Sequence, residues 1–229
     1  MSNMENSKYL NINFDEVVSI VRQKLGSYKP VILPSTTITR AAVLILFLNK
    51  KEIPHILFTK RTDSVETHKG QISFPGGAWD KTDKSLQETA VRETFEEVGI
   101  LPKYIQHLGQ LDDFFTVTDF IVSPFAGFMT EQVDYVINEA EVAEVLEVPL
   151  SLFLQKSYFE VKKWEHRGQY YDVYFYYYGN QVIWGATAFM LNRFIDTVFE
   201  YNPAPHPVRQ DPRNLAYLKE NQVRGGTKS

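Results

Sequence analysis

The sequence predicts an α/β fold in which a mixed sheet is sandwiched between helices. Short segments rich in β-branched and aromatic residues recur along the middle of the chain, which is typical of strands. Amphipathic helical patterns stand near both ends of that series and once within it. With 229 residues, of which 44% are hydrophobic, the chain is long enough for one large domain, which we favour over two small ones.

The elements follow in a simple order. An amphipathic helix is expected over Asp15–Leu25 and should pack on the main body, with Pro30 and Pro34 in the connector behind it. The expected strands are Ala41–Leu48, Ile56–Lys60, Gln71–Phe74, Ile105–Leu111, Ile121–Met129, and a hairpin of Tyr158–Glu165 and Tyr170–Tyr178. A central helix should span about Ser85–Val98, and a last helix should run from near Trp184 to about Phe199.

We divide the chain into an N-terminal helical extension (1–37), a main domain (38–200) and a polar C-terminal tail (201–229). The tail from Asn202 has four prolines and many charged residues, so we expect it to be extended or mobile.

The central helix has recognisable ends. Ser85, followed three residues later by Glu88, predicts a capping box, and Gly99 suits the position just past the last turn. At about 100° per residue, the apolar side chains cover one half of the circumference. They are Leu86, Ala90, Val91, Thr94, Phe95 and Val98.

Three carboxylates share one arc of this helix. Glu93, Glu96 and Glu97 fall within about 100°, and Glu97 borders the apolar half, so its carboxylate should be partly buried. Burying like charges together is expensive unless cations neutralise them, which calls for Arg92 and a divalent metal. Hard oxygen ligands suit Mg²⁺ or Mn²⁺. For the helix alone, however, a surface ion-pair ladder in which Arg92 bridges Glu88 and Glu96 is the more ordinary interpretation.

The turn upstream of the helix favours the metal site over the surface ladder. Gly76-Gly77 lets the backbone approach a ligand closely, and the short polar loop from Ala78 to Lys84 leads back to the helix. A main-chain carbonyl can therefore join the acids at a metal.

The segment from Gly77 to Ile100 resembles the Nudix box, which runs from a glycine through an early acid to Arg-Glu-hydrophobic-x-Glu-Glu-x-Gly-hydrophobic. Two departures stand out. The distance from Gly77 to Arg92 is one residue longer than in that pattern, so the early acid is either Asp83 or is displaced at the next position by Lys84. Thr94 also stands where a larger apolar residue is usual.

The longer loop is found in the coenzyme A pyrophosphatase subfamily, and an upstream segment supports that subfamily. Leu57–Arg61 and His68–Gly77 are similar to the signature that precedes its Nudix box, and Ile183–Ala188 resembles the start of its C-terminal helix. Glu66 departs from the pattern, which often has a basic residue there, and this puts one electrostatic contact to a phosphate-rich substrate in doubt.

The resemblance implies an α/β/α Nudix fold and a role for each matching residue. It implies that Glu96 and Glu97 supply metal oxygens, that Glu93 is a ligand or base, and that the carbonyl at Gly77 completes the shell. Arg92 would orient the acids. In the segment around Glu141, a family glutamate approaches the site from another loop, although solvent exposure of all four acids from Glu139 to Glu147 is about equally probable.

The resemblance also implies contacts to the substrate. Arg61, His68, Lys69 and Gln71 would reach the phosphates or the pantetheine arm. For His68 a structural hydrogen bond stays ahead of a catalytic role. The aromatic run Tyr170–Tyr178 can stack an adenine, but we favour core and sheet packing for it.

Composition excludes several other classes of protein. The net charge of −4 argues against a general binder of nucleic acid or anionic membranes. The absence of cysteine excludes disulfides and thiol chemistry. No segment has the length of a membrane span and the N-terminus has no secretory pattern, so a cytoplasmic location is expected.

Together, these observations predict a metal-dependent Nudix hydrolase that cleaves the diphosphate of coenzyme A or acyl-CoA. The resemblance implies 4′-phosphopantetheine species and adenosine 3′,5′-bisphosphate as products, and a possible homodimer by analogy. The alternatives are a Nudix hydrolase acting on another nucleoside diphosphate derivative, such as ADP-ribose or a sugar nucleotide, and a non-catalytic nucleotide-binding module.

Overall fold

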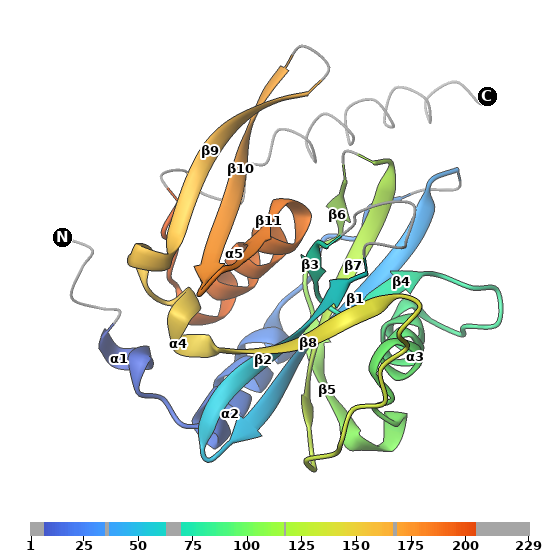
Figure 1. The fold of residues 1–229 in the computed structure, drawn as a ribbon, viewed down its shortest axis with the longest axis horizontal. Coiled ribbons are helices and arrows are strands. Elements are labelled where there is room, and N and C mark those ends of the chain that lie inside the picture. The colour runs from blue at the N-terminus through green and yellow to red at the C-terminus, as the bar shows by residue number, and fades with distance from the viewer. Residues whose placement is uncertain (1–6, 35–36, 63–69, 117, 167–168, 205–229) are drawn as a thin grey trace.

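The computed structural model describes residues 7–34, 37–62, 70–116, 118–166 and 169–204 (Figure 1). The helices are α1 (Ser7–Leu10), α2 (Phe14–Ser27), α3 (Leu86–Val98), α4 (Leu150–Phe153) and α5 (Gly185–Phe199). The strands are β1 (Thr39–Lys50), β2 (Ile53–Arg61), β3 (Ile72–Ser73), β4 (Gly76–Ala78), β5 (Ile105–Gln110), β6 (Phe114–Phe115), β7 (Phe120–Met129), β8 (Val142–Pro149), β9 (Phe159–His166), β10 (Gln169–Tyr178) and β11 (Gln181–Trp184). Short 3₁₀ turns lie at Pro102–Tyr104 and Lys156–Tyr158.

The larger sheet is mixed. Its main path is β3-β2-β1-β7-β5, with β8 paired to β2, β4 to β1 and β6 to β7. β1 and β7 run parallel, and the other pairs are antiparallel. The end of β2 pairs with β3 while the start of β1 pairs with β4, so the segment from Ile72 to Ala78 links two neighbouring strands of the sheet. A separate antiparallel sheet has the order β11-β10-β9.

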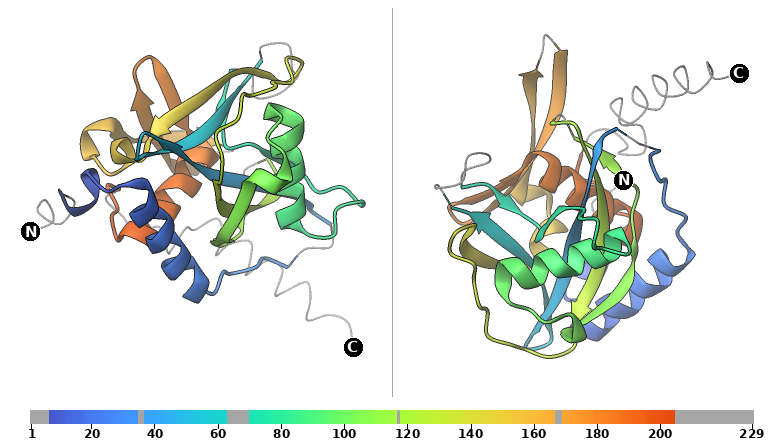
Figure 2. Two further views of the ribbon diagram at one scale, coloured as in Figure 1. Left: turned by 90° about the horizontal axis from the view of Figure 1, so that it is seen from below. Right: turned by 90° about the vertical axis from the view of Figure 1, so that its right-hand side faces the viewer.

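Two hydrophobic cores lie on opposite faces of the larger sheet. Alternate side chains of β1 serve each core, as expected for a strand buried on both faces. Ile45 and Phe47 join the core under α2, α5 and the small sheet, whereas Leu44 and Leu46 join the core under α3. Figure 2 shows α3 on one side of the sheet and α2 with α5 on the other. The predicted α/β sandwich with a mixed sheet is therefore confirmed.

The N-terminal extension is fastened to the main body by two adjacent aspartates. Asp112 accepts hydrogen bonds from Tyr28 Oη at 2.7 Å and from Arg193 Nη2 at 2.6 Å. Asp113, which is fully buried, accepts a hydrogen bond from Leu33 N at 2.9 Å and pairs with Arg40 at the start of β1. Together with the apolar face of α2, which packs into the core as expected, these contacts hold the start of β1 in place.

The predicted elements are found with shifted ends, and four strands were missed. The missed strands are β4, β6, β8 and β11. On α3, Phe95 was expected to face the core but is 44% exposed. In the aromatic run, Tyr174 and Tyr176 are buried against α5, as the packing interpretation predicts. None of the helices in the described residues is both long and apolar enough to cross a membrane.

Candidate active site

Local sequence signals define both ends of α3, the helix that carries the acidic residues. Ser85 Oγ accepts a hydrogen bond from Glu88 N at 3.2 Å, and Gly99 adopts the left-handed conformation with φ 75°. The reciprocal half of the predicted capping box is absent, because the Glu88 carboxylate accepts from Lys84 N instead, at 2.7 Å. The helix therefore begins and ends where the sequence indicates.

Asp83 and Arg92 form a bidentate ion pair beside the first turns of α3. Arg92 Nε donates to Asp83 Oδ1 at 2.9 Å, and Arg92 Nη2 donates to Oδ2 at 3.0 Å. Oδ2 also accepts hydrogen bonds from Thr89 Oγ1 at 2.9 Å and from Asp80 N at 3.1 Å. The hydrogen bonds from Arg92 lower the pKa of this buried carboxyl to about 2. Of the two positions considered for the early acid, 83 is thus the one whose side chain pairs with Arg92.

The same guanidinium group faces two of the helix acids. Arg92 Nη1 lies 2.8 Å from Glu96 Oε2 and 2.9 Å from Glu93 Oε1, while Nη2 donates to the Ala78 carbonyl at 3.2 Å. The predicted bridge to Glu88 does not form. Arg92 therefore ties the loop after the glycine turn to the acidic face of α3.

The glycine turn lies directly against Glu93. Gly76 has φ 152°, and Gly77 pairs with Ala42 of β1. A Cβ at position 77 would lie 2.5 Å from Glu93 Oε2, so only glycine permits this approach of backbone and carboxylate. The glycine turn and Glu93 therefore lie together, as the sequence predicts.

Glu97 is the most buried of the three helix acids, with 4% of its surface exposed. Thr59 Oγ1 donates a hydrogen bond to Glu97 Oε2 at 3.1 Å, and the Gly76 backbone N–H also donates to this carboxylate. Burial nevertheless raises the pKa of Glu97 to about 7, and nearby Glu93 adds to the rise. Glu97 is therefore buried, as its place on the helical wheel indicates. Of the surface ladder considered for Glu88, Arg92 and Glu96, the Arg92–Glu96 pair is present, and the Glu96 side chain is 52% exposed.

Glu93 has its own electrostatic environment. Burial raises the pKa of Glu93, Arg92 opposes that rise, and the charges of Glu96 and Glu141 add to it. Glu141 thus lies close enough to act on Glu93, although it belongs to the loop before β8. Of the neighbouring acids, Glu139 is exposed, but Glu147 is half-buried and pairs with Lys50.

Arg61 is the last residue of β2 and lies near the acids of α3. The pairing of β2 with β8 shifts register between Lys60 and Arg61, an irregularity of the kind that redirects side chains beside functional sites. Arg61 N donates to Gln71 O at 2.9 Å, which brings these two predicted contact residues together. Its buried Nε has no hydrogen-bond partner among the described residues, and its charge lowers the pKa of Glu97.

Two predicted contact residues, His68 and Lys69, lie outside the described residues, as does Glu66. Sequence reasoning missed Thr59, the hydroxyl partner of Glu97. The signal available was its place within Leu57–Arg61, the first part of the upstream signature.

The donor set fits a hard divalent cation in its chemistry. The carboxylates and the main-chain carbonyl at the nearby glycine turn supply oxygen atoms, the kind of ligand that Mg²⁺ and Mn²⁺ take. In the described part of the chain, no three acidic or histidine side chains already stand as a ready-made metal cluster. Arg92 instead occupies the space between Glu93 and Glu96 and supplies positive charge there.

Comparison with known proteins places this chain in a family. The family model described as the NUDIX domain matches residues 38–165. A protein of Photorhabdus laumondii named "Uncharacterized Nudix hydrolase NudL" is 39% identical over 158 residues, covering 69% of this chain and 84% of that protein. Its namesake in Pectobacterium atrosepticum is 40% identical over 140 residues, covering 61% and 73%.

Solved structures with similar folds include two Nudix proteins. A MutT/nudix family protein of Enterococcus faecalis matches 95% of this chain and 80% of its own, with a TM-score of 0.46 and 17% identity. The NUDIX domain of Shewanella oneidensis NrtR, solved with ADP ribose, matches 56% and 82%, with a TM-score of 0.42 and 23% identity. Because the domain model matches more than half of the sequence, the chain belongs to the Nudix hydrolase family.

Proposed function

We propose that this chain hydrolyses the diphosphate of coenzyme A or its acyl esters in a reaction that depends on Mg²⁺ or Mn²⁺. The products would be a 4′-phosphopantetheine species and adenosine 3′,5′-bisphosphate. One arrangement carries the hydrolase part of this proposal: the carboxylate of Glu93 lies against Gly77, with buried Glu97 on the same helix. The choice of coenzyme A rests on the sequence signature from Leu57 to Gly77.

A diphosphate resists hydrolysis because its negative oxygens repel an attacking hydroxide. A divalent ion, when bound, would screen that charge and lower the pKa of the attacking water. In the proposal, Gly77 O, Glu93, Glu96 and Glu97 hold the ion, and Nudix hydrolases in general use divalent metals. Arg92 would orient the acids through charge-assisted hydrogen bonds.

Two further groups complete the proposed site. Glu141, on a different loop, interacts electrostatically with Glu93. In the proposal it accepts a proton from the attacking water, and Glu93 is the alternative base. Arg61, with a buried and unpartnered Nε among the described residues, is suited to a phosphate oxygen. Gln71, His68 and Lys69 would extend that contact along the substrate.

A substrate panel tests the proposal. Coenzyme A, acetyl-CoA and ADP-ribose are each incubated with the chain and with Mg²⁺, Mn²⁺ or a chelator, and the products are identified by mass. We expect metal-dependent cleavage of the coenzyme A substrates. Cleavage of ADP-ribose alone would overturn the substrate assignment, and tight binding without turnover would favour a nucleotide-binding module.

Glu97→Gln provides the matching test of the site. We expect kcat to fall by about 100-fold or more, because the variant removes a charged oxygen donor with little change of shape. Glu160→Gln, an exposed glutamate on the distant β9, is the control and should retain activity. Equal activity of the two variants would contradict the proposed role of Glu97.

The homodimer and the cytoplasmic location stay predictions.

A further inference from the structure

The loop between β7 and β8 runs across the C-terminal end of α3. We call residues 130–141 the strap. Val136 N donates to Val98 O, and Asn138 N donates to Glu97 O, both at 3.0 Å. The last carbonyls of a helix have no partner within it, so the strap satisfies two of them. The contact is close, because a Cβ at Gly99 would lie 2.7 Å from Val136 Cβ.

Asn138 joins this helix end to the turn that presents Glu141. Its carbonyl accepts hydrogen bonds from Glu141 N at 3.0 Å and from Val142 N at 2.9 Å. Its side-chain Oδ1 accepts from Ala140 N at 3.2 Å, which is the pattern of an Asx turn. One residue therefore contacts the backbone of Glu97 on one side and that of Glu141 on the other.

The far side of the turn is held by Thr62, directly after β2. Thr62 N donates to Glu141 O at 3.0 Å, and Thr62 Oγ1 donates to Ala140 O at 3.2 Å. Glu141 itself is exposed. Its position next to the acids of α3 is therefore set by these backbone contacts and not by packing of its side chain.

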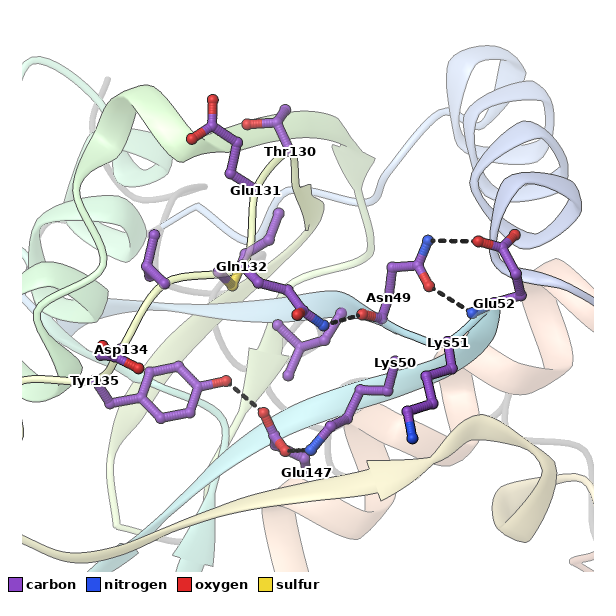
Figure 3. Close-up of a pocket in the computed structure, with 13 residues that line it drawn as sticks. Asn49, Lys50, Lys51, Glu52, Thr130, Glu131, Gln132, Asp134, Tyr135 and Glu147 are labelled. Carbon is purple, nitrogen blue, oxygen red and sulfur yellow. Dashed lines mark hydrogen bonds and ion pairs between the residues drawn. The ribbon is translucent and has the colours of Figure 1, made fainter.

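The upstream half of the strap is held by a separate set of contacts. It borders an open cavity of about 750 Å³ beside the β1–β2 turn (Figure 3). Across that cavity Gln132 Nε2 donates to Asn49 O at 2.7 Å, and Tyr135 Oη donates to Glu147 Oε1 at 2.7 Å, with Lys50 paired to the same carboxylate. These contacts lie several residues before Glu141, whereas those of Asn138 and Thr62 are made to the turn that carries it.

We propose that Asn138 is a positioning residue that holds Glu141 near Glu93. This inference rests on the proposed hydrolase function, because it assigns Asn138 no contact with substrate or metal. Residues that orient groups of a catalytic site in this way typically contribute about 10- to 100-fold to activity.

The first test compares two substitutions at the same position. Asn138→Ala removes the side-chain acceptor of the Ala140 amide but keeps the main-chain carbonyl that accepts from Glu141 and Val142. We expect the loosened Asx turn to lower kcat by about tenfold with KM changed by less than about twofold. Asn138→Asp retains an acceptor at the same place and should recover most of that loss. If Asn138→Ala is as active as wild type, or Asn138→Asp is as impaired as Asn138→Ala, the inference is wrong.

A double-mutant cycle shows whether Asn138 acts through Glu141. Glu141→Gln should lower kcat by itself, and adding Asn138→Ala to it should cost little more, because the group being positioned has already lost its charge. A full additional tenfold loss in the Glu141→Gln background, or full activity of Glu141→Gln alone, would overturn the inference.

Amide hydrogen exchange supplies a measurement that does not need turnover. In Asn138→Ala the amides of Glu141 and Val142 should exchange at least about tenfold faster than in wild type, while those in the middle of α3 stay unchanged. Unchanged exchange at both amides would refute the positioning role even in an active enzyme. If wild type cleaves no diphosphate but exchange rises as expected, the proposed function fails and the anchoring by Asn138 stands.

Discussion

Replacing Gly77 by alanine places a methyl group where the Glu93 carboxylate lies. The new Cβ would fall 2.5 Å from Glu93 Oε2, whereas non-bonded heavy atoms prefer about 3.5 to 4.0 Å. Gly77 is paired with Ala42 of β1, which restrains the backbone, so the carboxylate must move by about 1 Å. A displacement of that size in a catalytic site costs about 100-fold in rate.

Kinetics and stability are measured together for this variant. We expect kcat of diphosphate hydrolysis with Mn²⁺ to fall by about 100-fold, and the free energy of unfolding to fall by only about 1 to 3 kcal/mol, as for overpacking. Gly26→Ala is the matched control, since its Cβ would meet no atom within 4 Å at the end of α2. It should keep full activity and gain up to about 1 kcal/mol of stability. Full activity of Gly77→Ala would refute the inference that Glu93 must lie against this turn.

Three further predictions follow from contacts around the site. The pKa of Asp83 is lowered to about 2, so its contribution of about 2 kcal/mol to stability is complete above about pH 4 and is lost as the pH falls through 2. Asp83→Asn should therefore remove that part of the pH dependence of the unfolding free energy, measured by chemical unfolding. An unchanged pH dependence would contradict this prediction. Arg61→Gln should raise KM about tenfold with kcat changed less than about threefold in steady-state assays, and an unchanged KM would argue against a phosphate contact. Tyr135→Phe removes the hydrogen bond to Glu147 and should lower the free energy of unfolding by about 1 to 2 kcal/mol. The control Tyr177→Phe removes an equally short 2.7 Å bond to Glu160 on an exposed hairpin and should cost less than about 0.5 kcal/mol. Equal losses would show that burial of the Tyr135 contact is unimportant.

The fold could be predicted where periodicity and local caps agree. The helix from Ser85 to Gly99 and the long strands β1 and β7 carry strong signals of this kind. β4 escaped because Gly76-Gly77 has no strand propensity of its own and pairs only through the close approach of β1. β8 was missed because Glu144 and Glu147, three residues apart, break the alternation expected of a strand, and tertiary pairing with β2 overrides that composition.

Within the candidate site, spacing along one helix was readable and contacts between distant segments were not. The helical wheel correctly placed Glu97 at the border of the core. It wrongly placed Phe95 inside, because a wheel gives direction and not the extent of the neighbouring layer. Whether Arg92 would pair with Glu88 or Asp83 depended on the path of the loop between Ala78 and Ser85, which no periodicity specifies.

The distribution of charge gives a physical reason for the proposed metal dependence. Five carboxylates, those of Asp83, Glu93, Glu96, Glu97 and Glu141, gather in this region around the guanidinium groups of Arg92 and Arg61. Burial is the main cause of the raised pKa of Glu93 and of Glu97. Arg92 opposes this rise only in part for Glu93, because the same guanidinium group also donates two hydrogen bonds to Asp83. A diphosphate would bring further negative charge to that surface. Without a divalent cation the site would repel the proposed substrate, so the burial that raises these pKa values also creates the demand for the metal.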